Sequence, residues 1–211
     1  MTNKKINTAI LIGKGGRLKA IYNCAKKINN LDIRVVISHK KESPGVDWAK
    51  KKGIESFYFR LTDFKKQKKS REEFYKKLAE ILKKRKINFI VMAGWDLILS
   101  NEFLKKFPEQ VINIHPSLCP AFPGLDAPQQ ALNYGVKYTG CTLHFVPDEG
   151  VDTGPIILQR VVKIEPKDKL EDLEKKIHKK EEEILCEGIK LFADGKLKIK
   201  GRKVILINKN Q

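Results

Sequence analysis

The sequence has no long apolar run. Its hydrophobic residues occur in short runs of about four to eight, and none approaches the roughly 20 residues that a membrane-spanning helix needs. The opening MTNKKINTAILI places charge before apolar residues, but its apolar run is too short for a signal peptide and leads into glycines. These absences predict a soluble protein with no membrane partner.

Cysteine is also scarce, and its spacing is irregular. The four cysteines are widely scattered and form no CxxC pair: Cys24, Cys119, Cys141 and Cys186. Zinc sites and disulfide frameworks both need cysteines at regular, usually close spacing. The sequence therefore predicts neither a metal site nor disulfides, and it favours the reduced thiols of a cytoplasmic protein.

Acidic residues are few in comparison with basic ones, at 25 against 43, which gives a net charge of +18. A nucleic-acid partner is one interpretation, because lysines that neutralise phosphates release counterions. However, the lysines mix with acids at helical spacing in KKQKKSREEFYKK and LEKKIHKKEEE, which is typical of solvated helix surfaces. We therefore favour a lysine-rich surface over a nucleic-acid site. Part of its field would help to capture small anionic substrates.

Alternating strand and helix patterns predict one α/β domain, and 211 residues are enough for one substantial core. Short β-branched or aromatic runs predict strands at 7–12, 33–37, 54–59 and 88–93, and helices at 17–28, 46–52 and 70–86 fill the intervals. Ser70 and Glu73 predict a capping box. The expected fold is Rossmann-like, with an open, mostly parallel sheet flanked by helices.

The pattern changes after Gly94. We expect a loop rich in proline and glycine from Pro116 to Gly124, a turn at Asp194-Gly195 and a hairpin that turns at Lys200-Gly201. The remaining predicted elements are helices at 100–106, 126–134 and 168–192, and strands at 111–114, 139–146 and 155–164.

A glycine turn, Gly13 to Arg17, separates the first predicted strand from the first helix. Unpaired amides and the positive end of a helix dipole make an anion site there. The turn lacks the GK[ST] ending of a phosphate-binding P-loop, and Leu18 departs from the dinucleotide pattern GxGxxG. A purely structural turn is the alternative, and the cationic Arg17 favours phosphate.

The stretch NIHPSL places Asn113 and His115 at the end of a predicted strand, where ligands gather in open α/β sheets. The two residues are two apart, so their side chains point to the same side. A lone histidine is more often structural, but Asp152 follows in a loop between two strands, within residues 148–155. A carboxylate beside the imidazole would raise its pKa and orient it for acid-base work.

These residues resemble the phosphoribosylglycinamide formyltransferases, which have NIHPSL at a strand end, a Pro-Gly loop, HFV and VDTGPI. This chain has NIHPSLCPAFPG, LHFVPDEG and VDTGPIILQ, and the resemblance extends to the glycine turn, to Gly94 with ILS at 98–100 and to FADG at 192–195. It implies a formyltransferase fold and transfer of a formyl group from 10-formyltetrahydrofolate to the amine of glycinamide ribonucleotide, in purine biosynthesis. It implies no metal.

The resemblance also implies roles for individual residues. Asn113 and a protonated His115 would stabilise the developing oxyanion, and Asp152 would keep His115 charged. The ribonucleotide phosphate would contact Gly15, Gly16 and Arg17, and its amine would contact Glu181. The folate-binding residues would be Arg71, Asp96, Leu97, Ile98, Leu99 and Asn113. Residues 1–94 would form the phosphate- and nucleotide-binding half, and 95–211 the catalytic and folate-binding half.

Some positions depart from the family pattern. The family usually has Ser-Asn at Gly16-Arg17, often His at Asp126, Glu-His at Glu181-Glu182 and Tyr-Pro at Leu185-Cys186. Three consecutive glutamates on a lysine-rich helix more often form exposed ion pairs, which is an open alternative for Glu181. We expect the other histidines to be a packing residue, His144, and two surface or loop residues, His39 and His178.

Other functions share this motif. Methionyl-tRNA formyltransferase has it, and DAPQQ at 126–130 is similar to a segment of that enzyme; formyltetrahydrofolate deformylase is a second alternative. Both normally contain a further domain, for which 211 residues leave no room. A non-catalytic binding relative is the third alternative, against which the intact trio argues. The sequence permits a homodimer and does not decide the oligomeric state.

Overall fold

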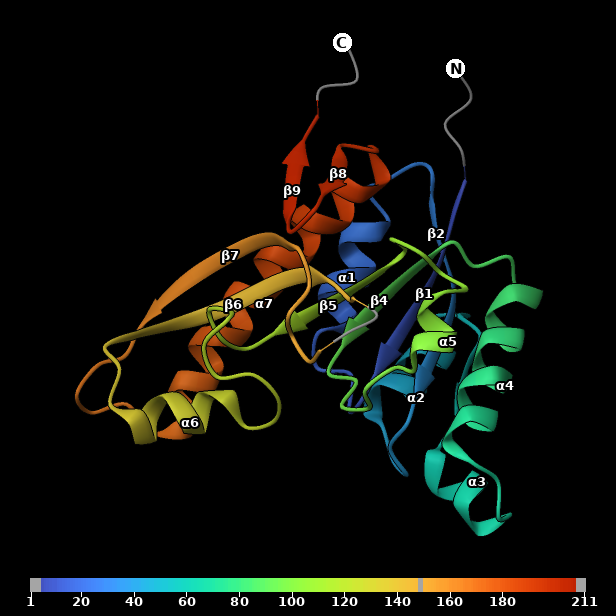
Figure 1. Ribbon diagram of the computed structural model, residues 1–211, viewed down its shortest axis with the longest axis horizontal. Helices are drawn as coiled ribbons and strands as arrows, with labels where there is room; N and C mark the ends of the chain where they lie inside the picture. The colour runs from blue at the N-terminus through green and yellow to red at the C-terminus, as the bar shows by residue number, and fades with distance from the viewer. Residues whose placement is uncertain (1–4, 148–149, 208–211) are drawn as a thin grey trace. The chain divides into compact units, whose positions relative to one another are not determined.

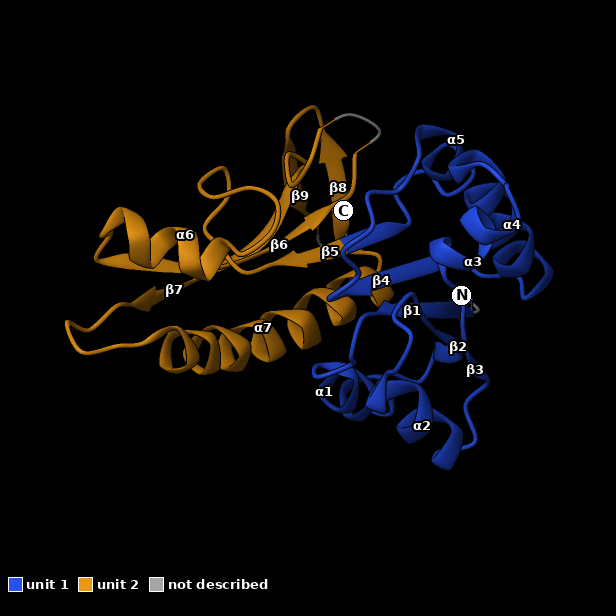
Figure 2. Cartoon of the chain, turned by 90° about the horizontal axis from the view of Figure 1, so that it is seen from below, with its two compact units in different colours: residues 1–112 blue, residues 113–211 orange. Residues whose placement is uncertain are grey.

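The computed structural model describes residues 5–147 and 150–207. It divides into two compact units, Met1–Ile112 and Asn113–Gln211, which Figure 2 colours blue and orange. Two acids of the predicted catalytic loop, Asp148 and Glu149, lie outside the described residues. The expected functional halves, 1–94 and 95–211, stay a prediction.

The first unit contains four parallel strands in the order β3-β2-β1-β4. Figure 2 shows α1 and α2 on one face of these strands and α3, α4 and α5 on the other. The strands are β1 (Ile6–Ile12), β2 (Leu31–Ser38), β3 (Ser56–Tyr58) and β4 (Phe89–Ala93), and the helices are α1 (Leu18–Ala25), α2 (Pro44–Lys51), α3 (Leu61–Lys66), α4 (Arg71–Lys84) and α5 (Asn101–Leu104).

The burial of the central strands explains this arrangement. Every residue of β1 and of β4 is buried, as expected for parallel strands that are covered on both faces. The predicted capping box is confirmed, because the Ser70 hydroxyl accepts from the Glu73 amide and the Glu73 carboxylate accepts from the Ser70 amide. Helix α3 was not predicted, since six residues are too few to show a clear helical period.

The second unit combines a sheet with two helices. Its strand order is β5-β6-β7-β9-β8; β6–β7 and β8–β9 are antiparallel, and β7–β9 is parallel. Helix α7 packs against β6 and β7. The strands are β5 (Val111–His115), β6 (Tyr138–Phe145), β7 (Ile156–Lys163), β8 (Leu197–Lys200) and β9 (Lys203–Leu206), and the helices are α6 (Ala127–Tyr134) and α7 (Leu170–Ala193), all labelled in Figure 1.

The predicted α/β fold, with a parallel sheet flanked by helices, is confirmed. One turn was placed wrongly. The register pairs Lys200 with Lys203, so the last hairpin turns at Gly201-Arg202, one residue later than predicted. In the part of the chain that the structure describes, no helix has both the length and the apolar character to span a membrane.

Candidate active site

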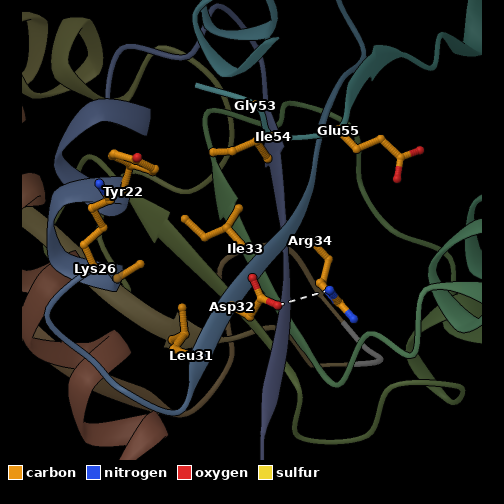
Figure 3. Close-up of a pocket in the computed structure, with 10 residues that line it drawn as sticks. Tyr22, Lys26, Leu31, Asp32, Ile33, Arg34, Gly53, Ile54 and Glu55 are labelled. Atoms are coloured by element: carbon orange, nitrogen blue, oxygen red, sulfur yellow. Dashed lines mark ion pairs between the residues drawn. The ribbon is translucent and has the colours of Figure 1, made fainter. Parts of the chain in front are cut away.

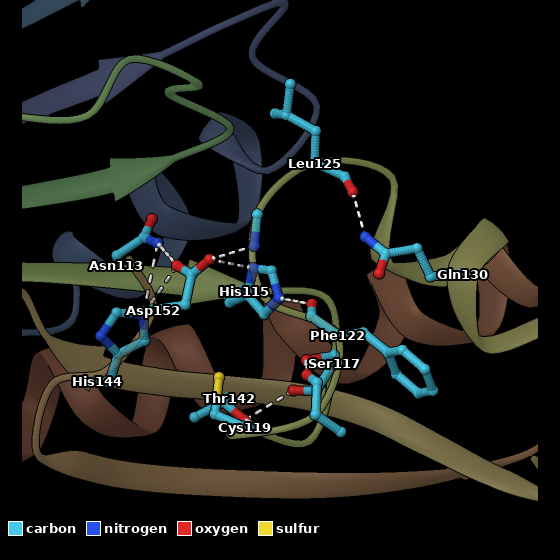
Figure 4. Close-up of polar contacts among 12 residues, drawn as sticks. Asn113, His115, Ser117, Cys119, Phe122, Leu125, Gln130, Thr142, His144 and Asp152 are labelled. Atoms are coloured by element: carbon cyan, nitrogen blue, oxygen red, sulfur yellow. Dashed lines mark hydrogen bonds and ion pairs between the residues drawn. The ribbon is translucent and has the colours of Figure 1, made fainter. Parts of the chain in front are cut away.

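The predicted trio comes together in the second unit, with Asp152 at its centre (Figure 4). Its Oδ2 lies 3.2 Å from His115 Nδ1, and its Oδ1 accepts from Asn113 Nδ2 at 3.3 Å. The Gly124 amide donates to Oδ2 at 2.9 Å. The side chains of His115 and Asp152 are only 4% and 9% exposed. The pair is therefore largely withdrawn from solvent.

Local backbone geometry places these side chains. Asn113 and His115 lie at the end of β5 and both reach Asp152, which confirms that they point to the same side. Asp152 itself has a φ of 54°, in the left-handed region that ordinary residues seldom adopt. The chain then passes so close to β6 that a Cβ at Gly154 would lie 1.7 Å from the Phe145 carbonyl oxygen. Only glycine fits there, and it lets the loop return Asp152 to β5.

A buried network holds the Pro-Gly loop that follows β5. Thr142 Oγ1, on β6, donates to the Ser117 carbonyl at 2.7 Å and accepts from the Cys119 amide at 3.0 Å. Gln159, opposite Thr142 on β7, donates to the Cys119 carbonyl at 3.1 Å. Strands β6 and β7 thus fix the start of this loop, at Ser117 and Cys119.

The electrostatics of the pair differ from the prediction. Burial lowers the pKa of His115 below its ordinary value, and the opposing effects of the Asp152 carboxylate and the Phe122 carbonyl do not overcome it. The expected rise in the pKa of His115 is therefore wrong, because the cost of burying the charge is the larger effect. Burial would raise the pKa of Asp152, but a hydrogen bond from His144 and the Gly124 amide hold it below its ordinary value.

His144 is a site residue that sequence reasoning missed. Its Nε2 lies 3.5 Å from Asp152 Oδ1 and 3.5 Å from Asn113 Nδ2, and its Nδ1 lies 2.9 Å from the Phe145 carbonyl oxygen. The residue is 1% exposed on β6, as predicted for a packing residue, but its ring is also directed at the carboxylate, which was not predicted (Figure 4). Its position in the HFV motif was the available signal.

The second ring nitrogen of His115 is also occupied. Nε2 lies 2.8 Å from the carbonyl oxygen of Phe122, a residue with a φ of 51°. Both neighbours of the ring, this carbonyl and Asp152, are acceptors. Only the doubly protonated ring can donate to both, while burial favours the neutral ring. The Phe122 carbonyl and the Asp152 carboxylate are therefore already placed to accept from a protonated His115 ring, although burial disfavours that protonation.

Glu181 is fully buried on α7, at 0% exposure, whereas Glu182 and Glu183 are exposed. The alternative of an exposed ion pair for Glu181 is therefore wrong. Burying a carboxylate costs free energy unless it is paired and hydrogen-bonded. The role of Glu181 in binding the amine stays a prediction.

The glycine turn is in the first unit, between β1 and α1. Gly15 has a φ of +88°, and a Cβ there would lie 2.7 Å from the Gly45 Cα, so a glycine is required. Gly16 faces open space. The Arg17 guanidinium lies near Gly94, with Nη1 3.7 Å from where a Cβ of Gly94 would be. The turn thus presents backbone amides at a helix start beside a cation, as the phosphate prediction requires.

A second histidine–aspartate pair lies after β2 and β4. His39 Nε2 is 3.4 Å from Asp96 Oδ2, and Lys40 forms an ion pair with the same oxygen. The contact with His39, together with the Lys40 ammonium, lowers the pKa of Asp96 to about 2, although partial burial opposes this. His39 lies in the loop after β2, as one of its two predicted alternatives had it, but its side chain is 6% exposed and packs on Trp95, so it is not a surface residue.

The other predicted folate-binding residues of the first unit lie in the loop that contains Asp96 or contact it. Arg71 Nη2, at the start of α4, donates to the Ile98 carbonyl at 2.7 Å, and the Tyr75 hydroxyl donates to the same oxygen. Ile98 is exposed, Leu97 is half-buried and Leu99 is buried. The structure therefore brings Arg71 to the loop of residues 96–99.

A shallow pocket of about 500 Å³ lies at the amino end of β2, whereas the glycine turn follows the carboxyl end of β1 (Figure 3). Its charged residues include Asp32, which pairs with Arg34 at 3.2 Å and with Lys5 at 3.3 Å. Its charges thus neutralise one another, and no predicted site residue lines it. Among the described residues, no group of three or more His, Cys, Asp or Glu side chains could hold a metal ion.

Comparisons with known proteins agree with the motifs. Residues 6–189 match the family model described as formyl transferase. The phosphoribosylglycinamide formyltransferase of Dictyostelium discoideum is 38% identical over 202 residues, covering 89% of this chain and 98% of that protein. The crystal structure of glycinamide ribonucleotide transformylase 1 from Symbiobacterium toebii is similar with a TM-score of 0.91 and 38% identity, covering 99% of this chain and 96% of that one.

Longer relatives match as well. The trifunctional purine biosynthetic protein adenosine-3 of Drosophila pseudoobscura pseudoobscura is 39% identical over 202 residues, which cover 94% of this chain. The match spans only 14% of that protein. The similarity to it therefore concerns one part of a much longer chain.

Proposed function

The chain belongs to the formyl transferase family, and we propose that it transfers a formyl group from 10-formyltetrahydrofolate to the amine of glycinamide ribonucleotide, a step of purine biosynthesis. The observation that supports this most directly is the Asp152 carboxylate between His115, His144 and Asn113, in the motifs that carry the resemblance. The proposal includes a cytoplasmic location, which suits four cysteines that form no disulfide with one another.

The reaction exchanges one C–N bond for another. The amine nitrogen of the acceptor attacks the formyl carbon, and the formyl oxygen becomes negative in the tetrahedral intermediate. The bond from the formyl carbon to N10 of the folate then breaks, and the proton lost by the amine ends on N10. The protein must therefore stabilise an oxyanion and help to move one proton.

The trio can perform both tasks. The amide of Asn113 and an N–H of His115 are donors for the oxyanion, and the negative charge that develops favours protonation of a ring that rests neutral. Asp152, whose lowered pKa keeps it ionised, can accept the amine proton directly or through water and pass it on. His144 and the Gly124 amide hold this carboxylate in place.

The Phe122 carbonyl has to be replaced during the reaction. It lies 2.8 Å from Nε2 of His115, the ring nitrogen that does not face Asp152. In our proposal the formyl oxygen takes the position of this carbonyl, and the Pro-Gly loop moves to permit it. The left-handed backbone of Phe122 favours such a change, because strain is relieved when the residue leaves this conformation.

Substrate contacts complete the proposal. The amides of Gly15 and Gly16 and the Arg17 guanidinium bind the ribonucleotide phosphate, and Glu181 binds the amine end of the acceptor. The backbone of Asp96, Leu97, Ile98 and Leu99 binds the pterin, and Arg71 lies near the glutamyl tail of the folate. No metal is needed in this chemistry.

The decisive experiment incubates the purified chain with 10-formyltetrahydrofolate and one of three acceptors: glycinamide ribonucleotide, methionyl-tRNA or water. We expect release of tetrahydrofolate only with glycinamide ribonucleotide, and formylated product in equal amount. Formate production without an acceptor would instead favour a deformylase. Formylation of the tRNA would favour the tRNA-directed alternative, and no reaction with any acceptor would favour a binding relative.

A further inference from the structure

The glycine turn of the first unit supplies few side chains to a ligand. Gly15 and Gly16 offer only backbone amides, and a Cβ at Gly16 would meet no atom within 4 Å, so the space beside it is open. The family usually has serine and asparagine where this chain has Gly16 and Arg17. A phosphate in the turn would therefore lack the hydroxyl and amide of those two side chains and would depend on cations nearby.

The end of β2 is bonded to the start of this turn. The buried Ser38 hydroxyl donates to the Gly13 carbonyl at 2.8 Å and accepts from the Lys40 amide at 3.2 Å. A Cβ on Gly13 would lie 3.5 Å from Cε of Lys40. Both the backbone and the side chain of Lys40 are therefore beside the first residue of the turn.

The Lys40 ammonium is held in place by a carboxylate. It forms an ion pair with Asp96, in the loop that follows β4, and the two side chains are 42% and 39% exposed. An ammonium has three N–H donors, so the contact with Asp96 leaves donors for a second anion. Because the pair is open to solvent, an incoming ligand can reach Lys40 without opening the core.

Arg17 is a second cation near the turn. Its Nη1 lies 3.7 Å from where a Cβ of Gly94 would be, and the Gly94 carbonyl oxygen lies 2.5 Å from where a Cβ of Gly13 would be. Arg17 and Lys40 thus approach two glycines that face each other. The Cα atoms of Gly13 and Gly15 are at most about 7 Å apart, so a phosphate on the Gly15 amide is within reach of a lysine side chain at Gly13.

We propose that Lys40 is a further phosphate-binding residue of the acceptor site, and that Asp96 positions its ammonium before the acceptor binds. This rests on the proposed function, in which Gly15, Gly16 and Arg17 bind the phosphate of glycinamide ribonucleotide. The ammonium keeps its contact with Asp96 and donates a second hydrogen bond to a phosphate oxygen. Together with Arg17, it matches the roughly two negative charges of a phosphate monoester with two positive charges.

The expected effect depends on the phosphate and on salt. A hydrogen bond to a charged group is stronger than a neutral one, although salt weakens it at an exposed position. We expect Lys40→Gln to raise the Kd and the KM for glycinamide ribonucleotide by about 10-fold at low salt and to change kcat by less than about twofold. The difference from the wild type should shrink in about 0.5 M salt, because exposed charges are screened.

The test measures binding by calorimetry for three ligands: glycinamide ribonucleotide, the same compound without its phosphate, and inorganic phosphate. Lys40→Gln should weaken binding of the nucleotide and of inorganic phosphate and leave binding of the unphosphorylated compound unchanged. Lys40→Arg should bind the nucleotide nearly as well as the wild type, because it keeps a cation. The matched control, Lys50→Gln, removes one exposed charge from the last turn of α2 and should change none of the three affinities.

Wild-type affinity of Lys40→Gln for the nucleotide overturns the proposal. Equal weakening for the compounds with and without phosphate overturns it too, by revealing a structural role. An equal loss of nucleotide binding in Lys50→Gln has the same consequence, by revealing a general effect of surface charge. The proposed function fails separately, if the wild type binds inorganic phosphate more tightly than Lys40→Gln does but formylates no glycinamide ribonucleotide.

Discussion

The two histidine–aspartate pairs of this chain have similar geometry but different surroundings. Each imidazole is almost fully buried, His115 at 4% and His39 at 6% exposure, and each lies just over 3 Å from a carboxylate. Asp152 is 9% exposed and contacts two imidazoles, an amide side chain and a backbone amide. Asp96 is 39% exposed and shares its oxygen with the Lys40 ammonium.

These different surroundings suit the two pairs to different tasks. Asp96 has access to solvent and is compensated by His39 and by the exposed Lys40 ammonium, which lower its pKa to about 2. Asp152 instead contacts imidazoles and amides, and burial lowers the pKa of His115, so a proton in this pair is not held strongly by either partner. We infer that the His115–Asp152 pair moves protons and that the His39–Asp96 pair connects strand ends.

The largest expected effect separates the two pairs by activity. We expect His115→Ala, Asn113→Ala and Asp152→Asn each to lower kcat by about 100-fold or more, because each removes an oxyanion donor or the proton acceptor. His39→Gln, the matched control from the His39–Asp96 pair, should lower kcat by less than about fivefold. Steady-state kinetics with circular dichroism to verify folding decides this. Near-normal turnover in any trio variant would remove that residue from the mechanism.

A smaller effect is expected at His144, which contacts Asp152 but no proposed reacting atom. His144→Gln retains a polar side chain of similar length, and we expect a loss of about 10-fold in kcat with little change in KM. His144→Ala should lose more, because it leaves a cavity beside the carboxylate. If both variants lower kcat equally and share the wild-type pH profile, His144 does not orient Asp152.

An NMR titration can test the coupling between His115 and Asp152. We expect the His115 resonance in the wild type to titrate below the ordinary histidine value, because burial lowers its pKa. In Asp152→Asn the pKa should fall further, since the carboxylate that raises it is gone. His115→Gln assigns the resonance. Identical titrations in the two proteins would mean that the residues are not coupled.

The smallest expected effect concerns acid stability. A carboxyl whose folded pKa is lowered stabilises the fold above its ordinary pKa of about 3.8, and this contribution is lost as pH falls towards the folded value. For Asp96, with a pKa of about 2, we expect about 1 kcal/mol after allowing for solvent screening. Urea unfolding of Asp96→Asn should show less dependence on pH between about 4 and 2 than the wild type. Parallel curves would show that the ion pair contributes nothing.

Much of the fold could be predicted from periodicity. The strands of the first unit are short and apolar, and a central parallel strand such as β1, buried along its whole length, leaves a continuous signal in the sequence. The capping box at Ser70 was predictable because it depends on residues three apart. Short elements such as α3 have no comparable local signal, since contacts such as that of Phe64 with Phe74 hold them.

The catalytic trio was predictable in part, for a different reason. The spacing of Asn113 and His115 on one strand determines that they share a side, and a recognisable motif identifies them. Asp152 lies 37 residues after His115. Its approach to His115 depends on the return of the chain beside β6 at Gly154. The sequence suggested Asp152 as the partner of His115, and the tertiary fold determined the distance between the two side chains.

Local patterns were enough to predict most of the secondary structure, the alternation that leads to a parallel sheet, and the choice of Asn113, His115 and Asp152 as the candidate trio. Only the tertiary structure decided the protonation behaviour of His115, the burial of Glu181 and the contact of His144 with Asp152. The physical reason is that propensity and periodicity depend on neighbours along the chain, whereas desolvation depends on everything packed around a side chain. A pKa therefore changes with burial that no local pattern records.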